Sequence, residues 1–379
     1  MHITFNKPFF SGHEIKYIQD ALSVGKISGN GKYTKLCQTF LEERYGFKKA
    51  LLTTSCTDAL EMCAILADIK PGDEVIVPSY TFVSTAIAFI RQGADVVFAD
   101  SGLDNPNILV EQIEGLITPR TKAIVPVHYA GVACDMDQIL DIATRHNLLV
   151  IEDAAQAIES FYTDRNGNKR ALGSIGHMAA FSFHETKNII AGEGGLLAIN
   201  DTRFIPRAEI IWEKGTNRAE FFRGEVNKYG WVDIGSSFLP SELNAAFLWA
   251  QLENLEMIQH KRIAIWNQYY EGLKDWAVKN NIQTPHVPDF ATNNAHMFYL
   301  ICANLEQRTH IISGLKEQGV SAVFHYQSLH KSDFYLKDHT YKPLQQVEIL
   351  SDCLVRLPMY YELSSEEVSK IIEIIKKSV

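Results

Sequence analysis

Short runs of β-favouring residues between positions 73 and 200 constrain the fold of this 379-residue chain more than any other feature. Amphipathic, helix-like stretches separate several of these runs, for example 57–69 and 136–147. Continuous Val, Ile and Leu runs that alternate with such helices are typical of a largely parallel sheet covered by helices on both faces. The pattern therefore predicts an α/β domain. The runs are 73–79, 94–100, 121–129, 147–153, 179–184 and 194–200.

The C-terminal third of the chain has a different pattern. Residues 241–276 are helix-like almost throughout and form either one long helix or two, of the kind that often connects domains. Further β-like runs and helices follow and predict a small α+β domain. We therefore expect a large domain over 1–245 and a small domain over 246–379. The later elements are runs at 297–303 and 321–327, a helix near 307–318, and a final helix within 364–378 that opens with Ser and two Glu.

Composition argues against several classes of function. A formal net charge of −9 argues against nucleic acid or an acidic membrane as a partner. The six cysteines are scattered without a CxxC pair, so we expect no structural zinc and no metal site. The N-terminus lacks the pattern of a signal peptide, and no apolar run approaches the ~20 residues of a membrane span. We expect a soluble protein of the cytoplasm.

Lys187 is the most informative single residue. It stands in the apolar and small-residue stretch FSFHETKNIIAGEGG, residues 181–195. A lysine is normally a solvated surface group, and a buried one needs a partner or a task. Lysine becomes reactive when its amine is neutral or when it forms a Schiff base, and pyridoxal 5'-phosphate is the commonest partner in enzymes. That cofactor also requires an acid for its ring nitrogen and a cradle for its phosphate.

Both further requirements have candidates in the sequence. Asp153 ends the predicted strand 147–153, where ligands bind in open α/β sheets, although it is equally placed to cap the following helix. Gln156 either reaches the ring hydroxyl or is an exposed helix residue. Residues 53–56 lead into a helix beginning near Thr57, and helix N-termini bind phosphate. An ordinary Ser/Thr cap explains this last segment at least as well.

Two other side chains fit such a site. Ser182 lies five residues before Lys187 and suits a phosphate donor, or is simply a strand hydroxyl. Phe82, in PSYTFVSTA, suits stacking on a cofactor ring, although a core phenylalanine is the usual alternative.

Six short motifs, spaced along the chain in the family's order, resemble those of the DegT/StrS-type sugar-nucleotide aminotransferases. The resemblance runs from about Phe9 to the C-terminal helix. It implies fold type I of the pyridoxal-phosphate enzymes, which is aspartate aminotransferase-like: a large domain with a mostly parallel mixed sheet flanked by helices, and a smaller C-terminal α+β domain. The motifs are 57–60, 71–75, 78–82, 126–131, 152–156 and 182–188.

The resemblance extends further to one branch, the dTDP-4-amino-4,6-dideoxygalactose transaminases. The phrases that carry it are SFHETKN, EKGTNRAEFFRGEVNKY (213–229), DIGSS (233–237), NAHMFY (294–299) and VFHY (323–326). It implies that L-glutamate gives up its amino group and leaves as 2-oxoglutarate. The amino group then passes to C4 of dTDP-4-keto-6-deoxy-D-glucose. Enterobacterial common antigen and O-antigen precursors are both compatible with this product.

The resemblance also implies roles for the cofactor-binding residues. Lys187 bonds to the cofactor aldehyde and later moves a proton as general base and acid. Asp153 pairs with the pyridinium, and Gln156 approaches the ring hydroxyl. The other implied contacts are Phe82 over the ring face, the backbone amides of Thr57 and Asp58 on the phosphate, and the hydroxyl of Ser182 on the phosphate.

The sequence departs from the family pattern in one segment. Many relatives place an asparagine in the segment corresponding to 235–241, where it reaches across a dimer to the partner's phosphate. Here the run is GSSFLPS, and Ser237 is the candidate replacement. The implied assembly is a homodimer with shared active sites.

Residues 201–240 are rich in Gly, Asn, Arg and aromatic residues and lack a clear period. So long a segment in a compact domain favours a functional or interface loop. We favour Arg218 and Arg223 as contacts to the substrate diphosphate, although a solvated charged loop is equally compatible. His325 and Tyr326 face the sugar or belong to the core.

Alternative functions remain open at this point. The first is a related sugar-nucleotide aminotransferase that makes the gluco epimer or a 3-amino sugar. The second is a dehydratase on the same scaffold, but such relatives carry histidine where this chain has Lys187. The third is a non-catalytic sugar-nucleotide-binding protein on the same fold.

Overall fold

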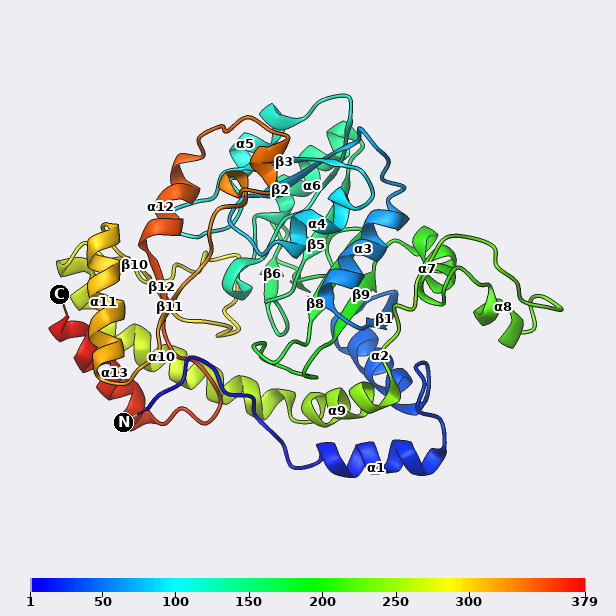
Figure 1. The fold of residues 1–379 in the computed structure, drawn as a ribbon, viewed down its shortest axis with the longest axis horizontal. Coiled ribbons are helices and arrows are strands. Elements are labelled where there is room, and N and C mark those ends of the chain that lie inside the picture. Colours follow the sequence, from blue (N-terminus) through cyan, green and yellow to red (C-terminus); the bar gives the residue numbers. More distant parts are fainter. Residues whose placement is uncertain (1, 379) are drawn as a thin grey trace.

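A sheet of seven strands forms the centre of the structure, a computed structural model that describes residues 2–378. The strand order is β1-β9-β8-β5-β4-β2-β3 (Figure 1). Only β9 runs antiparallel to its neighbours, so the sheet is mostly parallel but mixed, which confirms the expected fold class. The strands are β1 (Lys49–Thr53), β2 (Glu74–Pro78), β3 (Asp95–Ala99), β4 (Thr121–Ile124), β5 (Leu149–Asp153), β8 (Met178–Ser182) and β9 (Gly195–Ile199).

Helices cover both faces of this sheet, as the continuous apolar runs predict. Successive strand residues point to opposite faces, and both sets are apolar. Leu52, Ile76 and Val150 belong to a core shared with α2, α5 and α6. Leu51 and Val75 belong to a second core shared with α3, α4 and α7. The helices are α2 (Lys32–Tyr45), α3 (Cys56–Leu66), α4 (Ser84–Ile90), α5 (Val110–Leu116), α6 (Met136–His146) and α7 (Ile205–Trp212).

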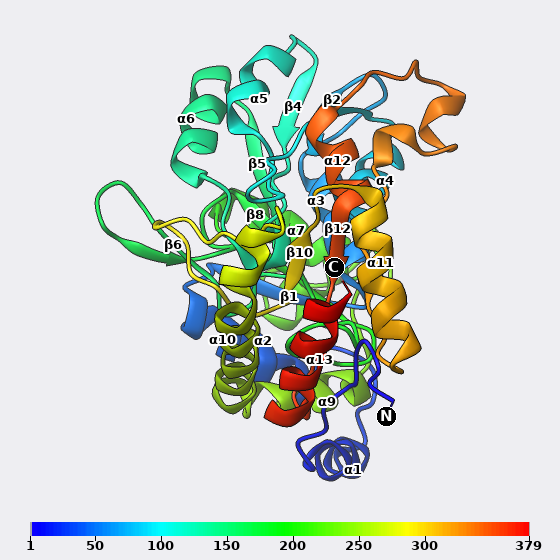
Figure 2. The same ribbon diagram turned by 90° about the vertical axis from the view of Figure 1, so that its left-hand side faces the viewer.

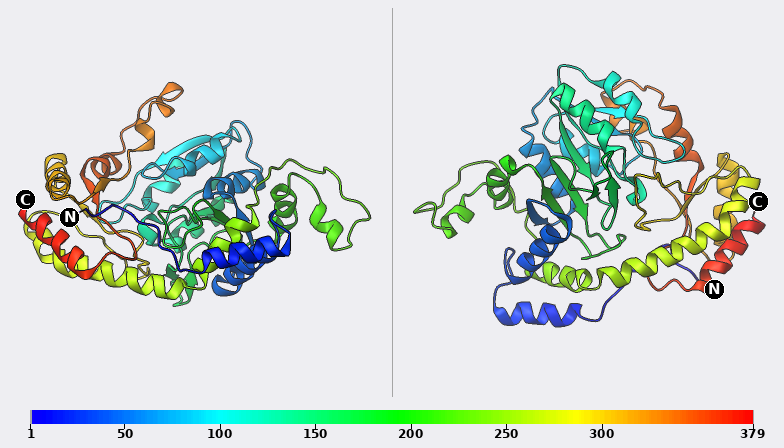
Figure 3. Two further views of the ribbon diagram at one scale, coloured as in Figure 1. Left: turned by 60° about the horizontal axis from the view of Figure 1, so that its bottom comes forward. Right: turned by 180° about the vertical axis from the view of Figure 1, so that it is seen from behind.

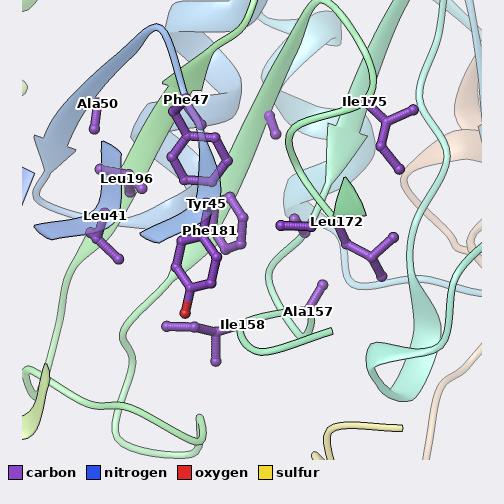
Figure 4. Packing of buried hydrophobic residues seen from close by; sticks show 14 of the residues in the cluster. Leu41, Tyr45, Phe47, Ala50, Ala157, Ile158, Leu172, Ile175, Phe181 and Leu196 are labelled. Carbon is purple, nitrogen blue, oxygen red and sulfur yellow. The ribbon is translucent and has the colours of Figure 1, made fainter. Parts of the chain in front are cut away.

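The first of these cores is densely aromatic near β8 and β9. Phe47 lies with its ring centroid 5.6 Å from that of Phe181 and 5.6 Å from that of Tyr45. Figure 4 shows these rings together with Leu41 and Leu196. Burial of such rings supplies a large part of the hydrophobic stabilisation of the sheet, and β8 carries the site lysine's loop at its end.

A second, smaller sheet lies toward the C-terminus, in the order β10-β12-β11 with antiparallel pairing. Its core includes Phe298, Leu300 and Val355, which pack with long helices visible in Figure 2. The last helix begins with a capping box between Ser364 and Glu367, as its sequence predicts. The elements are α10 (Leu255–Lys279), β10 (Tyr299–Ile301), α11 (Leu305–Glu317), β11 (Val323–Phe324), α12 (Gln345–Cys353), β12 (Leu354–Arg356) and α13 (Ser365–Lys377).

The helix-like stretch 241–276 is two helices, α9 (Glu242–Leu252) and α10, interrupted at Glu253 and Asn254. α9 lies beside α1 (Glu14–Val24), and its buried residues belong to the first core (Figure 1). The division into domains after residue 245 stays a prediction.

Residues 213–238 form what we call the projecting loop. It contains the short helix α8 (Arg218–Phe222) and stands away from the rest of the chain in both views of Figure 3. It leaves Phe222 70% exposed and Trp231 83% exposed.

The remaining elements are short. A hairpin pairs β6 with β7 beside the main sheet. Within residues 2–378, none of the helices combines the length and the apolar run that a membrane crossing requires. The short elements are β6 (Phe161–Thr163), β7 (Lys169–Ala171) and the 3-10 turns Tyr129–Gly131, Thr202–Phe204, Leu329–Lys331 and Tyr335–Lys337.

Candidate active site

The sheet register brings three chain segments to one edge. β1 and β8 both pair with β9, and Thr53 and Ser182 each lie opposite Gly195. β5 runs parallel to β8, with Asp153 opposite Ala180. The carboxyl ends of β1, β5 and β8 therefore meet, and ligands bind at this edge of open α/β sheets.

A cavity of about 640 Å³ opens at this edge, and Lys187 and Asp153 both line it. Lys187 follows β8 in the loop before β9. Burial lowers the pKa of Lys187, although Cys56 and Asp153 partly oppose this effect. The amine is therefore neutral more often than a solvated lysine, which is the form that attacks carbonyls and accepts protons.

Asp153 is held in place by two hydrogen bonds. Its Oδ2 accepts from Thr85 Oγ1 at 2.7 Å and its Oδ1 accepts from the Ala155 amide at 3.1 Å. Burial raises the pKa of this carboxyl, and the two hydrogen bonds offset only part of the rise. A buried carboxylate of this kind favours a cationic partner in the cavity, and the protonated nitrogen of a pyridine ring is one that fits.

Glu152, the neighbour of Asp153, anchors the end of β5 from the opposite side. It is fully buried and lies 2.9 Å from His128 Nε2. It also accepts hydrogen bonds from the amides of Gly173, Ile175 and Gly176. Burial raises the pKa of Glu152, but these hydrogen bonds outweigh it, so the carboxyl titrates below its usual range. The charged network fixes the strand that presents Asp153.

The start of α3 borders the cavity. Ser55 is the N-cap and accepts from the Asp58 amide at 3.1 Å, while Cys56 and Thr57 line the cavity. The first amides of a helix have no intrahelical acceptor, so those of Cys56 and Thr57 are free for an anion. Gly195 permits this arrangement, because a Cβ there would lie 2.4 Å from the Ser55 carbonyl carbon. The free amides fit a phosphate group.

Most of the predicted site residues come together in this cavity. Gln156 accepts from the Ala130 amide at 2.6 Å and donates to the Tyr326 hydroxyl at 3.3 Å. The Tyr129 hydroxyl and His325 Nδ1 lie 3.2 Å apart. The predicted residues that line the cavity are Thr57, Phe82, Asp153, Gln156, Ser182, Lys187, His325 and Tyr326.

Four predicted residues lie outside the lining of this cavity. The Asp58 amide is taken by the cap at Ser55, which is the physical reason that it is not free. Ser237 forms a backbone bridge with Glu213 at the base of the projecting loop. Arg223 pairs with Glu209 at 2.7 Å and with Glu225 at 2.8 Å, and Arg218 lies 3.9 Å from Glu213. Their roles toward cofactor or substrate stay predictions.

The sequence reasoning missed other residues of the lining. Thr85 had no signal beyond its place in the PSYTFVSTA motif, and its contact with Asp153 joins distant parts of the chain. His296 is buried in the lining and its Nδ1 lies 2.9 Å from Asn188 Oδ1. Arg356 did leave a signal, because it is the single charge in the apolar run LVRLPM, residues 354–359.

A second cavity of about 620 Å³ adjoins the first. The two share Thr81, Phe82 and Tyr326 in their linings. The combined space accommodates a ligand much larger than a cofactor and an amino acid, and Phe82 stands where the two spaces meet.

Comparison with known proteins identifies the family. The model of the DegT/DnrJ/EryC1/StrS aminotransferase family matches residues 10–376. The chain belongs to this family. This aminotransferase is 32% identical over 386 residues to the spore coat polysaccharide biosynthesis protein SpsC of Bacillus subtilis, covering 100% of this chain and 97% of SpsC.

Solved structures of similar proteins agree with the family assignment. A protein described as a sugar aminotransferase, Spr1654 of Streptococcus pneumoniae in its PMP form, superimposes with a TM-score of 0.91 at 25% identity. That match covers 100% of this chain and 98% of Spr1654. Helicobacter pylori PseC, an aminotransferase of pseudoaminic acid biosynthesis, gives a TM-score of 0.91 at 25% identity over 100% and 99% of the two chains.

The chain is therefore an enzyme, an aminotransferase that depends on pyridoxal 5'-phosphate, and the cofactor expectation is confirmed. The residues present fit that cofactor. When it is bound, Lys187 would hold its aldehyde, Asp153 its ring nitrogen and the start of α3 its phosphate.

Proposed function

We propose that this aminotransferase acts on a sugar nucleotide. In the proposed reaction, the amino group of L-glutamate passes to C4 of dTDP-4-keto-6-deoxy-D-glucose, giving dTDP-4-amino-4,6-dideoxy-D-galactose and 2-oxoglutarate. The observation that carries the proposal is the placement of the partly accessible Lys187 and the buried Asp153 in one cavity at the carboxyl edge of the sheet. The sequence resemblance to transaminases of this branch supports the choice of acceptor.

Each of these two residues has a distinct task in the proposed reaction. When bound, pyridoxal phosphate supplies a ring that withdraws the electron pair left when the donor loses its α-proton. Lys187 Nζ takes that proton from the donor and, in the second half of the reaction, delivers a proton to C4 of the sugar. Asp153 holds the ring nitrogen protonated, because a buried carboxylate favours an adjacent cation.

The second cavity supports a large acceptor. A nucleotide sugar needs room beyond the cofactor pocket, and the adjoining space of about 620 Å³ begins at Phe82 and Tyr326. We propose that the sugar lies near His325 and Tyr326 and that the nucleotide extends away from Lys187.

The projecting loop supports a homodimer with shared sites. Its exposed aromatic side chains, Phe222 and Trp231, would be costly to leave in water on an isolated chain. We propose that the loop docks on a second copy, so that Arg218, Arg223 and Ser237 reach the partner's cavity rather than their own. This placement explains why the three residues lie outside the cavity of their own chain.

Product analysis tests the reaction. The purified enzyme is incubated with pyridoxal phosphate, L-glutamate and dTDP-4-keto-6-deoxy-D-glucose, and the product ring couplings are read by NMR. An axial amine at C4 is the expected result. An equatorial C4 amine would assign the gluco epimer, and an amine at C3 would assign a 3-amino sugar; either result overturns the proposed product.

A further inference from the structure

Arg356 carries a charge for which residues 2–378 supply no paired carboxylate. It is the last residue of β12, the middle strand of the small sheet, and its side chain lines the cavity of Lys187. Its Nε is buried without a hydrogen-bond partner, and within residues 2–378 no carboxylate forms an ion pair with it. Its Cζ lies 4.9 Å from the centroid of the Phe5 ring.

Another arginine of the chain shows what a structural role requires. Arg262 is buried, whereas Arg356 is half-buried, yet Arg262 Nε donates to the Ala295 carbonyl at 3.1 Å and its Nη2 donates to the His296 carbonyl at 2.7 Å. Backbone carbonyls thus satisfy that guanidinium. Because burying an unpaired charge costs free energy, a group left like Arg356 is expected to acquire a partner from outside the chain.

The charges around the cavity favour an anion as that partner. Asp153 and Glu193 are the carboxylates in the lining. Asp153 is bound by Thr85 and suits the ring nitrogen, while Glu193 is exposed and lies 3.7 Å from His184. Neither neutralises Arg356. Arg356 and Lys187 line the same cavity, and the charge of Arg356 helps to lower the pKa of Lys187, so an anion that binds in this cavity is favoured.

We propose that Arg356 binds the α-carboxylate of the amino-acid donor, a role that rests on the proposed function. The α-carboxylate is attached directly to the carbon that gives its proton to Lys187, so its binding group must lie in the same cavity. The diphosphate of a nucleotide sugar is several bonds away from C4, and the cofactor phosphate is provided for at the start of α3. A guanidinium grips a carboxylate through two parallel hydrogen bonds, which also orients the α-proton.

The test compares Arg356→Met and Arg356→Lys with the wild-type holoenzyme in the donor half-reaction. The conversion of L-glutamate is followed by the change in cofactor absorbance. 4-Aminobutyrate is the comparison donor, because its amine-bearing carbon has no carboxylate. Binding of α-methyl-L-glutamate, which has no α-proton to lose, is measured by calorimetry. For Arg356→Met we expect the binding of L-glutamate and of α-methyl-L-glutamate to weaken roughly 30-fold or more. Arg356→Lys should recover part of this binding. The preference for L-glutamate over 4-aminobutyrate should shrink by a similar factor.

Two controls separate this role from a structural one. Arg356→Met should keep the cofactor affinity and the melting temperature of the wild type, because it removes a half-buried charge whose Nε has no hydrogen-bond partner. Arg145→Met, at an exposed pair with Glu114, should leave donor binding unchanged.

The outcomes distinguish the two proposals. If Arg356→Met binds α-methyl-L-glutamate as tightly as the wild type does, Arg356 does not bind the α-carboxylate of the donor. A wild-type enzyme that uses L-alanine or L-glutamine but not L-glutamate would overturn our choice of donor, and the same comparison made with that amino acid would then decide on Arg356. A wild type that reacts with no α-amino acid would overturn both.

Discussion

The cofactor cavity and the projecting loop differ in what their side chains contact. The carboxylates at the cavity are hydrogen-bonded within the chain, whereas aromatic side chains of the loop face solvent. Asp153 in the cavity wall and Glu152 behind it accept hydrogen bonds from backbone amides and side chains of the same chain. In the loop, the basic side chain of Arg223 pairs with nearby carboxylates, while Phe222 and Trp231 face outward. One chain therefore supplies the hydrogen bonds to both carboxylates by itself, but it leaves the aromatic side chains of the loop exposed.

The difference follows from how each region is anchored. The cavity residues stand at strand ends, where the sheet ladder fixes the backbone before any ligand binds. The loop closes on itself through isolated bridges, Glu213 with Ser237 and Thr216 with Trp231, and its side chains reach the body through ion pairs such as that of Asp233 with Arg207. Preorganised strand ends suit catalysis, whereas a weakly anchored loop suits docking on another surface.

Replacing Lys187 is expected to have the largest effect and tests the catalytic side of the comparison. Lys187→Ala should lower turnover by about 10²–10⁴-fold, because it removes the group that moves the proton. The absorbance band of the bound cofactor should shift as well. Lys169→Ala, on the β6–β7 hairpin, is the control and should behave like the wild type. Near-normal transamination by Lys187→Ala would contradict the assigned role.

Breaking the network behind Asp153 tests whether the cavity is rigid without ligand. Glu152→Ala leaves His128 and three amides without their buried acceptor. We expect a loss of about 3–5 kcal/mol in the free energy of unfolding, measured by urea denaturation of the apoenzyme. Glu111→Ala, on the surface of α5, should not change the stability. A stable Glu152→Ala enzyme would mean that the sheet alone positions Asp153.

The sequence predicts the cavity better than the loop for the same physical reason. Strand runs, helix caps and the order of motifs are local patterns, so the strands, the Ser364 cap and the Lys187–Asp153 pair could all be located. The antiparallel direction of β9 could not be predicted, because a buried apolar run has the same sequence pattern in parallel and in antiparallel pairing. The break at residues 253–254 carries no Gly or Pro, so one helix and two were equally compatible.

Contacts between distant segments account for the rest of what the sequence did not reveal. Thr85 meets Asp153 only after α4 and β5 are assembled in the sheet. The Asp58 amide was expected to bind phosphate, but whether a cap or a ligand takes that amide depends on the Ser55 rotamer. The charge of Arg356 stands out in the sequence, but only the structure shows that its Nε lacks a hydrogen-bond partner among residues 2–378.

An acidic substitution in the projecting loop tests the docking side of the comparison. Trp231→Asp should weaken self-association by at least about 30-fold, the usual cost of losing an aromatic anchor of about 2 kcal/mol at an interface. Light scattering during size-exclusion chromatography over a dilution series measures the effect. Leu305→Asp, at another exposed apolar site at the start of α11, is the matched control. A monomeric wild type would contradict the assembly itself.

Removing one loop cation should have the smallest effect on the enzyme and the most selective one. Arg223→Ala breaks exposed pairs with Glu209 and Glu225, so the stability should change by less than about 1 kcal/mol. If the loop reaches the partner's cavity, KM for the dTDP-sugar should rise while the donor half-reaction with L-glutamate stays unchanged. Steady-state and single-half-reaction kinetics separate the two. Only a contact to the acceptor slows one half of the reaction alone. Equal losses in both half-reactions would therefore place Arg223 in the cofactor site instead. Unchanged kinetics would mean that Arg223 is only a surface charge.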